Sequence, residues 1–96
     1  MNRDRAMKMV RSLTRRYFEV ATQANLNYST LGTLLELNAT QVKRLRDRPD
    51  NLPADVFLLM YQQVQTIQKL LDAGSLPVKK LRGPQQQEAI DTILGG

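Results

Sequence analysis

The segment YSTLGTLLELNATQVKRLRD, residues 28–47, carries the most informative pattern in the chain. Its apolar residues recur at helical spacing in two short runs, over about 30–35 and 38–48, on either side of a break at residues 36–38. Ser29 is placed to cap the first run and Asn38 the second, where Gln41 completes a capping box. Pro49 ends any helix just beyond. The segment therefore predicts two short helices joined by a tight turn.

The spacing matches a helix-turn-helix unit, in which two short helices cross at a steep angle and a small residue lies near the crossing. When Tyr28 is taken as the first position of this twenty-residue pattern, the small position falls on Gly32. The apolar positions are filled in the same register by Leu31, Leu35, Leu37, Val42 and Leu45.

Residues 29–45 resemble the helix-turn-helix of the lambda repressor and Cro-type (Xre-like) family of prokaryotic and phage regulators. The similarity covers residues 28–47 and, loosely, the helix before them. From Pro53 onward it stops, because one long helix is expected there and the family usually has a pair of short ones. The family also has glycine in the turn where this chain has Glu36. A non-glycine residue at positive φ costs about 1 kcal/mol.

The resemblance implies a sequence-specific regulator that binds double-stranded DNA and carries its second short helix into the major groove. Arg and Lys donate to guanine and Thr serves either role, so Thr40, Lys43 and Arg44 suit base edges or phosphates. Arg46 is expected at the periphery. The residues expected to face DNA are Ser29, Thr30 and Gln41, which suit phosphates at helix ends, together with Asn38, Ala39, Thr40, Lys43, Arg44, Asp47 and Arg48.

The rest of the chain also reads as helix, which predicts an all-α fold of four to five helices with a long fourth one. A first helix is expected over about 4–24, because its apolar residues recur at alternating steps of four and three. A long helix should run from Pro53, at its first position, to the stop signal Gly74, and a short one over 84–94. We expect residues 1–76 to form the helix-turn-helix domain. Residues 77–96 are expected to form a basic connector and a short helix that serve as an oligomerisation arm.

Composition argues against an enzyme. The chain has 96 residues and contains no histidine, cysteine or tryptophan, so the usual general base, activated nucleophile and zinc ligands are missing. No cofactor and no metal are expected. No apolar stretch approaches the roughly 20 residues of a membrane span. We read no signal peptide at the amino-terminal end and expect a cytoplasmic protein.

Basic residues gather in two places. Fourteen Lys and Arg stand against nine acids, for a net charge of +5. One cluster fills the first sixteen residues, where a solvated helix face is the favoured interpretation over direct DNA contact. The second cluster consists of Lys43, Arg44, Arg46 and Arg48. Such an excess favours a polyanionic partner.

Several alternatives stay open at this stage. The same leucines would serve an ordinary helical bundle, so the runner-up is a protein-interaction module, such as an antitoxin or a phage inhibitor of a host protein, whose basic face meets an acidic partner. A third reading is nucleic-acid coating without sequence preference. The start of the fourth helix is apolar nearly all round, and with Ile90, Ile93 and Leu94 it is expected to form a homo-oligomer interface, as a dimer or a tetramer.

Overall fold

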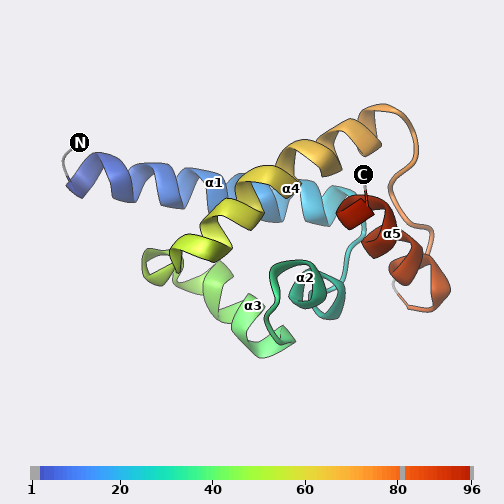
Figure 1. Ribbon diagram of the computed structural model, residues 1–96, viewed down its shortest axis with the longest axis horizontal. Coiled ribbons are helices and arrows are strands. Elements are labelled where there is room, and N and C mark those ends of the chain that lie inside the picture. The colour runs from blue at the N-terminus through green and yellow to red at the C-terminus, as the bar shows by residue number, and fades with distance from the viewer. Residues whose placement is uncertain (1–2, 81, 96) are drawn as a thin grey trace.

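All regular structure in the described part of the chain is helical (Figure 1). The structure is a computed structural model that describes residues 3–80 and 82–95. These residues form five α-helices and one short 3-10 turn, and within them there is no strand, so the expected all-α fold is confirmed. The elements are α1 (Arg3–Gln23), α2 (Tyr28–Leu35), α3 (Ala39–Asp47), the 3-10 turn η1 (Pro49–Asn51), α4 (Ala54–Asp72) and α5 (Pro84–Gly95).

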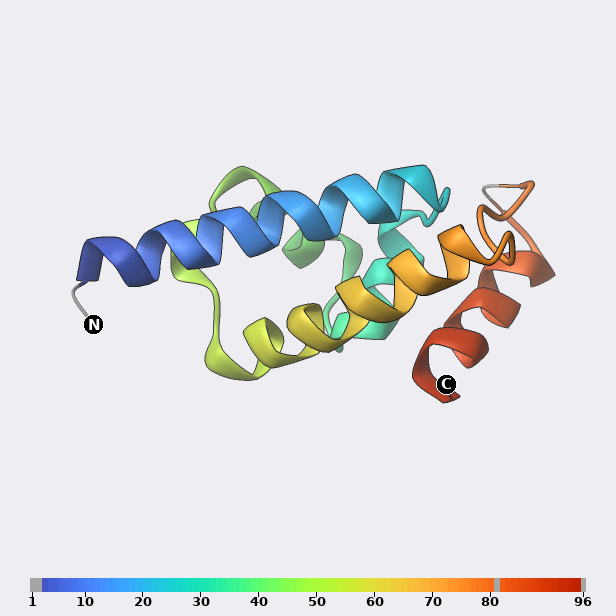
Figure 2. The same ribbon diagram turned by 90° about the horizontal axis from the view of Figure 1, so that it is seen from above.

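Two long helices form one side of the molecule. Helices α1 and α4 lie side by side, as the two views at right angles agree (Figure 1, Figure 2). The short helices α2 and α3 lie beneath them, and α5 crosses the end of the body near α2. The molecule measures 42 × 27 × 20 Å. No helix in the described ranges is both long enough and apolar enough to cross a membrane.

The apolar stripe of α1 is buried along its second half. The amino-terminal end of α1 extends beyond the rest of the body, which leaves its first turns with few neighbours (Figure 1). The stripe therefore changes from half-buried to fully buried along the helix. Its half-buried members are Ala6, Val10 and Leu13, and its buried members are Tyr17, Val20 and Ala24.

The start of α2 differs from the sequence prediction. The helix begins at Tyr28, and Asn27 caps it instead of Ser29. Asn27 has extended backbone angles, and its Oδ1 accepts a hydrogen bond of 2.8 Å from the Thr30 amide. Ser29 then lies inside the first turn, where its side chain is exposed. Asparagine and serine are about equally good caps, so composition alone did not separate them.

The ends of α4 follow the prediction closely. Pro53 is the residue just before the helix and not its first helical residue. At the other end Gly74 adopts φ 78°, and the chain closes in a Schellman motif. The Ser75 amide donates to the Leu70 carbonyl over 2.9 Å, and the Gly74 amide to the Leu71 carbonyl over 3.1 Å. Gly74 is thus the helix stop that the sequence indicates.

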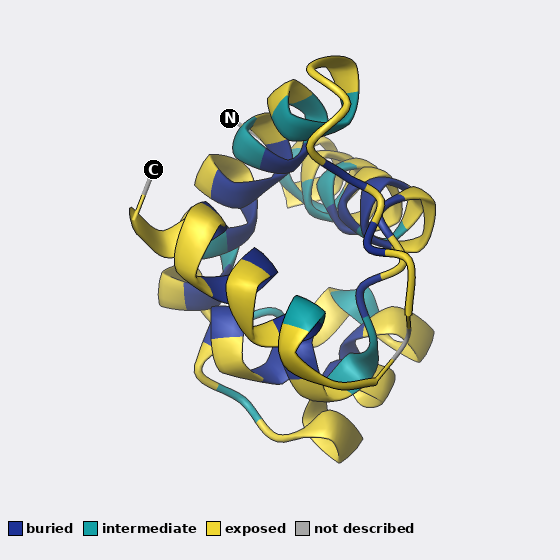
Figure 3. Cartoon of the chain, turned by 90° about the vertical axis from the view of Figure 1, so that its right-hand side faces the viewer, coloured by how far each residue is buried: buried dark blue, intermediate teal, exposed yellow. Residues whose placement is uncertain are grey.

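Residues 76–95 belong to the same core as the rest, which corrects the expected division of the chain at residue 76. Helix α5 packs on α2 and α4, and Figure 3 shows its inner face buried. An amphipathic helix buries its apolar face against a neighbouring surface. Here that surface is formed by α2 and α4 of the same chain, so α5 does not extend as a separate arm. The segment's buried apolar residues are Leu76, Val78, Ala89, Ile90 and Ile93, and Gln86 is buried beside them.

Candidate nucleic-acid interface

The turn between α2 and α3 is closed by a second Schellman motif. Glu36 takes the left-handed conformation with φ 60° and ψ 39°. The Leu37 amide donates to the Gly32 carbonyl over 2.7 Å, and the Glu36 amide points to the Thr33 carbonyl at 3.4 Å. These bonds satisfy carbonyl groups that the end of a helix leaves without partners. The positive φ expected at this position is thus present, on a glutamate.

Gly32 lies against the backbone of this turn. A Cβ atom at Gly32 would stand 2.5 Å from the Leu37 carbonyl oxygen, well inside van der Waals contact. The absence of a side chain therefore lets the turn fold back onto α2. This close approach is the physical reason why the sequence pattern requires a small residue at position 32.

The start of α3 is fixed by a reciprocal capping box. The Asn38 Oδ1 atom accepts from the Gln41 amide over 2.8 Å, and the Gln41 Oε1 atom accepts from the Asn38 amide over 2.9 Å. Both bonds were expected from the sequence. They satisfy the backbone amides of Asn38 and Gln41, which have no partner within the helix, so α3 begins at a defined residue.

Helix α3 turns one narrow side inward and the rest outward. Val42 and Leu45 are buried, and the other seven of its nine residues are exposed. At 100° per residue, the direction opposite Val42 and Leu45 is occupied by a ridge of four side chains. We call this set the α3 ridge; its members are Thr40, Lys43, Arg44 and Asp47.

The α3 ridge is flanked by further cations. Arg46 lies on one flank, where its guanidinium donates to the Tyr28 hydroxyl at the start of α2. Arg48 follows the end of α3 and is exposed. In the described residues the single salt bridge is Arg11–Asp50, so neither Lys43 nor Arg44 is in an ion pair, and Asp47 is the one acid on the same ridge. The outer surface of α3 is therefore a positively charged one.

The loop after α3 is fastened to α1 by that salt bridge. The Arg11 Nε and Nη2 atoms donate to the two carboxylate oxygens of Asp50 over 2.8 and 3.1 Å. The hydrogen bond from Arg11 lowers the pKa of Asp50 below its ordinary value. The paired geometry orients both groups, although each side chain is about half exposed.

The residues expected to face DNA are exposed, with one exception. Thr30 is buried, and its hydroxyl donates to the Gln86 Oε1 atom over 2.7 Å. Its side chain has no access to a phosphate, so we withdraw it from the candidate interface. The side of α2 that carries Thr30 is covered by α5. The remaining nine, which are exposed, are Ser29, Asn38, Ala39, Thr40, Gln41, Lys43, Arg44, Asp47 and Arg48.

Two buried glutamines hold α2, and the sequence analysis assigned neither of them a role. Gln63 of α4 accepts from the Tyr17 hydroxyl over 2.8 Å and donates from Nε2 to the Leu34 carbonyl over 2.7 Å. It links α1, α4 and the last turn of α2. Burial raises the pKa of the Tyr17 phenol, so the hydroxyl keeps its proton and remains a donor.

Gln86 of α5 holds the other end of α2. Its Oε1 atom accepts from the Thr30 hydroxyl and, at 3.4 Å, from the Asn27 amide. Its Nε2 atom donates to the carbonyls of Asn25 (2.8 Å) and Lys80 (3.1 Å). The available signal was the tract of three consecutive glutamines, 85–87, but nothing in it marks the middle one as buried.

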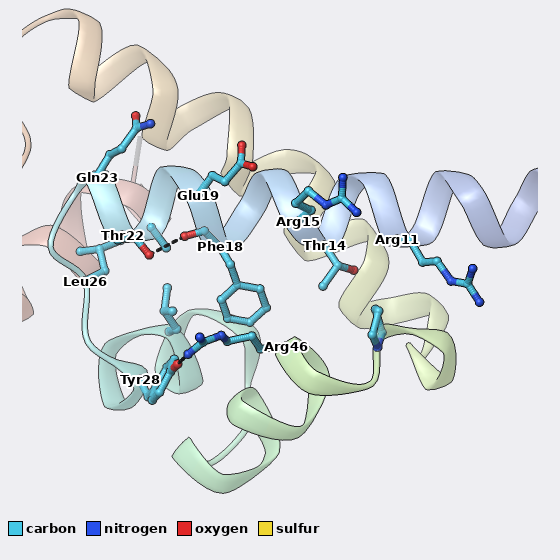
Figure 4. Close-up of a pocket in the computed structure, with 13 residues that line it drawn as sticks. Arg11, Thr14, Arg15, Phe18, Glu19, Thr22, Gln23, Leu26, Tyr28 and Arg46 are labelled. Carbon is cyan, nitrogen blue, oxygen red and sulfur yellow. Dashed lines mark hydrogen bonds between the residues drawn. The ribbon is translucent and has the colours of Figure 1, made fainter.

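A groove of about 830 Å³ separates α1 from α2 and α3 (Figure 4). Its lining includes the half-buried Phe18 and the buried Leu26 and Leu31. Arg46 and Tyr28 meet across its lower side, as the dashed contact in Figure 4 shows. Arg11 and Arg15 lie along α1 at its upper edge. The groove combines an apolar lining with a mostly basic rim.

Comparison with protein-family models, with curated proteins and with solved structures finds no match for this chain.

Proposed function

We propose that the protein is a sequence-specific DNA-binding regulator of prokaryotic or phage type, and that α2, the turn and α3 form its helix-turn-helix. The observation that carries the proposal is the α3 ridge, on a short helix fixed at both ends: it exposes Thr40, Lys43 and Arg44, with Asp47 as its one acid. Lys43 and Arg44 suit guanine edges or phosphates, and Thr40 suits either role. Ser29, in the first turn of α2, suits a phosphate.

The internal geometry of residues 28–47 supports this proposal. The apolar positions of the pattern, filled by Leu31, Leu35, Val42 and Leu45, are buried, and Leu37 is half-buried. Gly32 accommodates the returning turn. A bundle without this constraint would not need a glycine among helix-forming leucines, because glycine costs about 1 kcal/mol relative to alanine inside a helix. The action we propose is steric: the bound protein blocks or recruits polymerase in the cytoplasm, without chemistry or a cofactor.

We further propose that the regulator binds as a dimer through an apolar face on α1 and α4. Met9, Leu58 and Tyr61 are 50%, 59% and 54% exposed, an unusual extent for large apolar side chains. Met9 and Leu58 border a hollow of about 420 Å³ whose other lining residues are all apolar. Of the three residues of α5 that the sequence suggested for this role, Ile90 and Ile93 are buried within the monomer, whereas Leu94 is 56% exposed.

The dimer would place two α3 helices at the same time on two half-sites about one DNA turn apart. The expected result in sedimentation equilibrium is a dimer at micromolar concentration, and Leu58→Asp is expected to give a monomer. Gln23→Asp, an exposed change at the far end of α1 and about 20 Å along the helix from Met9, is the control and should leave the dimer intact. A wild-type monomer would contradict this part of the proposal.

Fluorescence anisotropy tests DNA binding itself. A pool of random duplexes is selected for retention by the protein, and the recovered site is compared with unselected duplex across a salt series. We expect log affinity to fall with log salt by about 0.9 per neutralised phosphate. We also expect the recovered site to bind at least about 10³-fold tighter than the unselected duplex. Affinity without preference would instead indicate a nonspecific coating protein.

A second candidate function rests on the groove between α1 and α2–α3. Its partly apolar lining and the guanidinium groups of Arg15 and Arg46 at its edge suit an acidic protein segment with an apolar anchor, as an antitoxin or an inhibitor of a host protein would require. Absence of DNA binding even at low salt, with an intact helical fold, would favour this candidate over the first.

A further inference from the structure

Residues 76–80, which follow the end of α4, are attached to the body although they have no regular structure. Leu76 and Val78 are buried in the core. The Val78 amide donates to the Ala24 carbonyl over 3.1 Å, and the Asn25 Nδ2 atom donates to the Val78 carbonyl over 3.0 Å. These contacts attach the segment to the end of α1.

The backbone that follows is fixed by two glutamine side chains. The amides of Lys79 and Lys80 both donate to the Gln85 Oε1 atom, over 2.9 and 3.2 Å. The Lys80 carbonyl accepts from the Gln86 Nε2 atom over 3.1 Å. Ordering a residue costs about 1–2 kcal/mol of conformational entropy, and surface connections are commonly left loose. A fixed backbone here gives its exposed side chains a defined starting position.

Those exposed side chains are cationic. Lys79, Lys80 and Arg82 are all exposed. The single salt bridge in the described ranges lies elsewhere, between Arg11 and Asp50, so no carboxylate neutralises the three. Like charges on neighbouring residues repel each other, and an unneutralised cluster of this kind suits a polyanion. We call these three residues the basic connector.

The basic connector borders the exposed side of α2, which leads to α3. Arg82 and Gly83 line a polar hollow of about 420 Å³ together with Ser29 and Thr33. Ser29 and Thr33 are the exposed side chains of α2 and lie one helical turn apart. Glu36, in the turn that follows, and Thr40 of α3 are also exposed. Figure 1 shows α2 between α3 and this connection.

We propose that the basic connector is a second DNA contact, which grips the phosphate backbone beside the stretch met by the α3 ridge. The inference rests on the proposed DNA-binding function and adds a contact that carries no sequence information. Phosphate contacts position a protein on the duplex and contribute equally for every sequence, whereas base contacts discriminate. The two clusters would then divide these roles between them.

The test compares two variants that lose equal charge. Lys80→Gln with Arg82→Gln removes two charges from the basic connector. Arg16→Gln with Lys69→Gln removes two exposed charges from α1 and α4, the two long helices beneath which α2 and α3 lie (Figure 1). Circular dichroism checks the fold, which these exposed substitutions should preserve. Affinity is measured by anisotropy for the selected duplex and for unselected duplex over a salt series.

We expect the connector variant to lose the same factor of affinity for both duplexes and to reduce the salt slope by about 1.8, since each phosphate contact contributes about 0.9. The control variant should keep the wild-type slope. An unchanged slope in the connector variant, or an equal change in both variants, would overturn the inference while the proposed function stands. No DNA binding by the unaltered protein would overturn both.

Discussion

Helices α2 and α3 are neighbours of almost equal length, eight and nine residues, yet they relate to the molecule in opposite ways. Five residues of α2 are buried, and buried glutamines hold it at both ends. Only two residues of α3 are buried. Its far end is fastened through the exposed Arg11–Asp50 pair and an exposed contact between Arg46 and Tyr28.

The buried α2 therefore serves as structural support, whereas α3 leaves most of its side chains exposed for binding. Polar bonds inside the core are strong because water does not compete for them, and an unmade one costs about 1–3 kcal/mol. Exposed pairs contribute little. Substitutions in or around α2 should therefore change the free energy of unfolding, and substitutions on the outer side of α3 should change binding and leave stability alone.

The largest effect on stability is expected from Gln86→Ala. It removes the partners of the Thr30 hydroxyl and of the Asn25 and Lys80 carbonyls at once. The lost bond of the buried Thr30 hydroxyl costs about 1–3 kcal/mol, and the two part-buried carbonyls add a smaller cost, so the loss should total about 3 kcal/mol in urea denaturation. The control is Gln87→Ala, the exposed neighbour in the same helix, which should lose less than about 0.5 kcal/mol. Equal losses in the two variants would show that the Gln86 side chain does not anchor α2.

The next largest effect is expected from Gly32→Ala. The new Cβ would stand 2.5 Å from the Leu37 carbonyl oxygen, so the turn must shift. Such overpacking typically costs about 1–3 kcal/mol, which exceeds the gain of about 1 kcal/mol in helix propensity. Thermal unfolding compared with Thr33→Ala, an exposed change in the same helix, measures this loss. A more stable Gly32→Ala protein would mean that the turn does not approach α2 as described.

A smaller effect of opposite sign is expected from Glu36→Gly. Glu36 holds φ 60°, where glycine is unstrained, so the substitution should stabilise the protein by about 1 kcal/mol. Glu36 also lies in the turn that leads into α3, and removal of its negative charge should strengthen DNA binding. Glu36→Gln serves as control, because it removes the charge and keeps the strain. A Gly variant no more stable than the Gln variant would contradict the strain at this position.

The smallest effect is expected from Asp50→Asn at the far end of α3. Asp50 has a lowered pKa in the folded protein, so its contribution to stability is present above its ordinary pKa and is lost as the pH falls through the folded pKa. The variant and the wild type should differ slightly at neutral pH, less at high salt, and not at all in strong acid. Urea denaturation at several pH values checks this trend. A difference that grows in acid would contradict the assigned direction.

Local chemistry made much of this structure predictable from sequence. The five helices, the capping box at Asn38 and the stop at Gly74 depend on residues close together in the chain, and each was expected. The position of Gly32 in the pattern also located the turn correctly. Such features follow from backbone sterics and from hydrogen bonds between near neighbours.

The features that the sequence did not predict depend on contacts between distant residues. Ser29 and Asn27 are both good caps, and Asn27 is the cap because α2 begins at Tyr28. Thr30 is buried only because α5 folds back onto α2, which brings Gln86 to its hydroxyl. The apolar side of α5 was consistent equally with an oligomer interface and with the monomer core. Periodicity identifies an apolar face and does not identify its partner.

We propose that the α3 ridge reads DNA while α2 supports it, and one variant tests both parts. Lys43→Ala with Arg44→Ala is compared with the wild type by anisotropy on the selected duplex and by urea denaturation. We predict an unfolding free energy within about 0.5 kcal/mol of the wild type. We also predict the loss of at least about tenfold in preference for the selected over the unselected duplex, since a base contact contributes about 1–3 kcal/mol of discrimination. Retained preference for the selected duplex in this folded variant would contradict the claim.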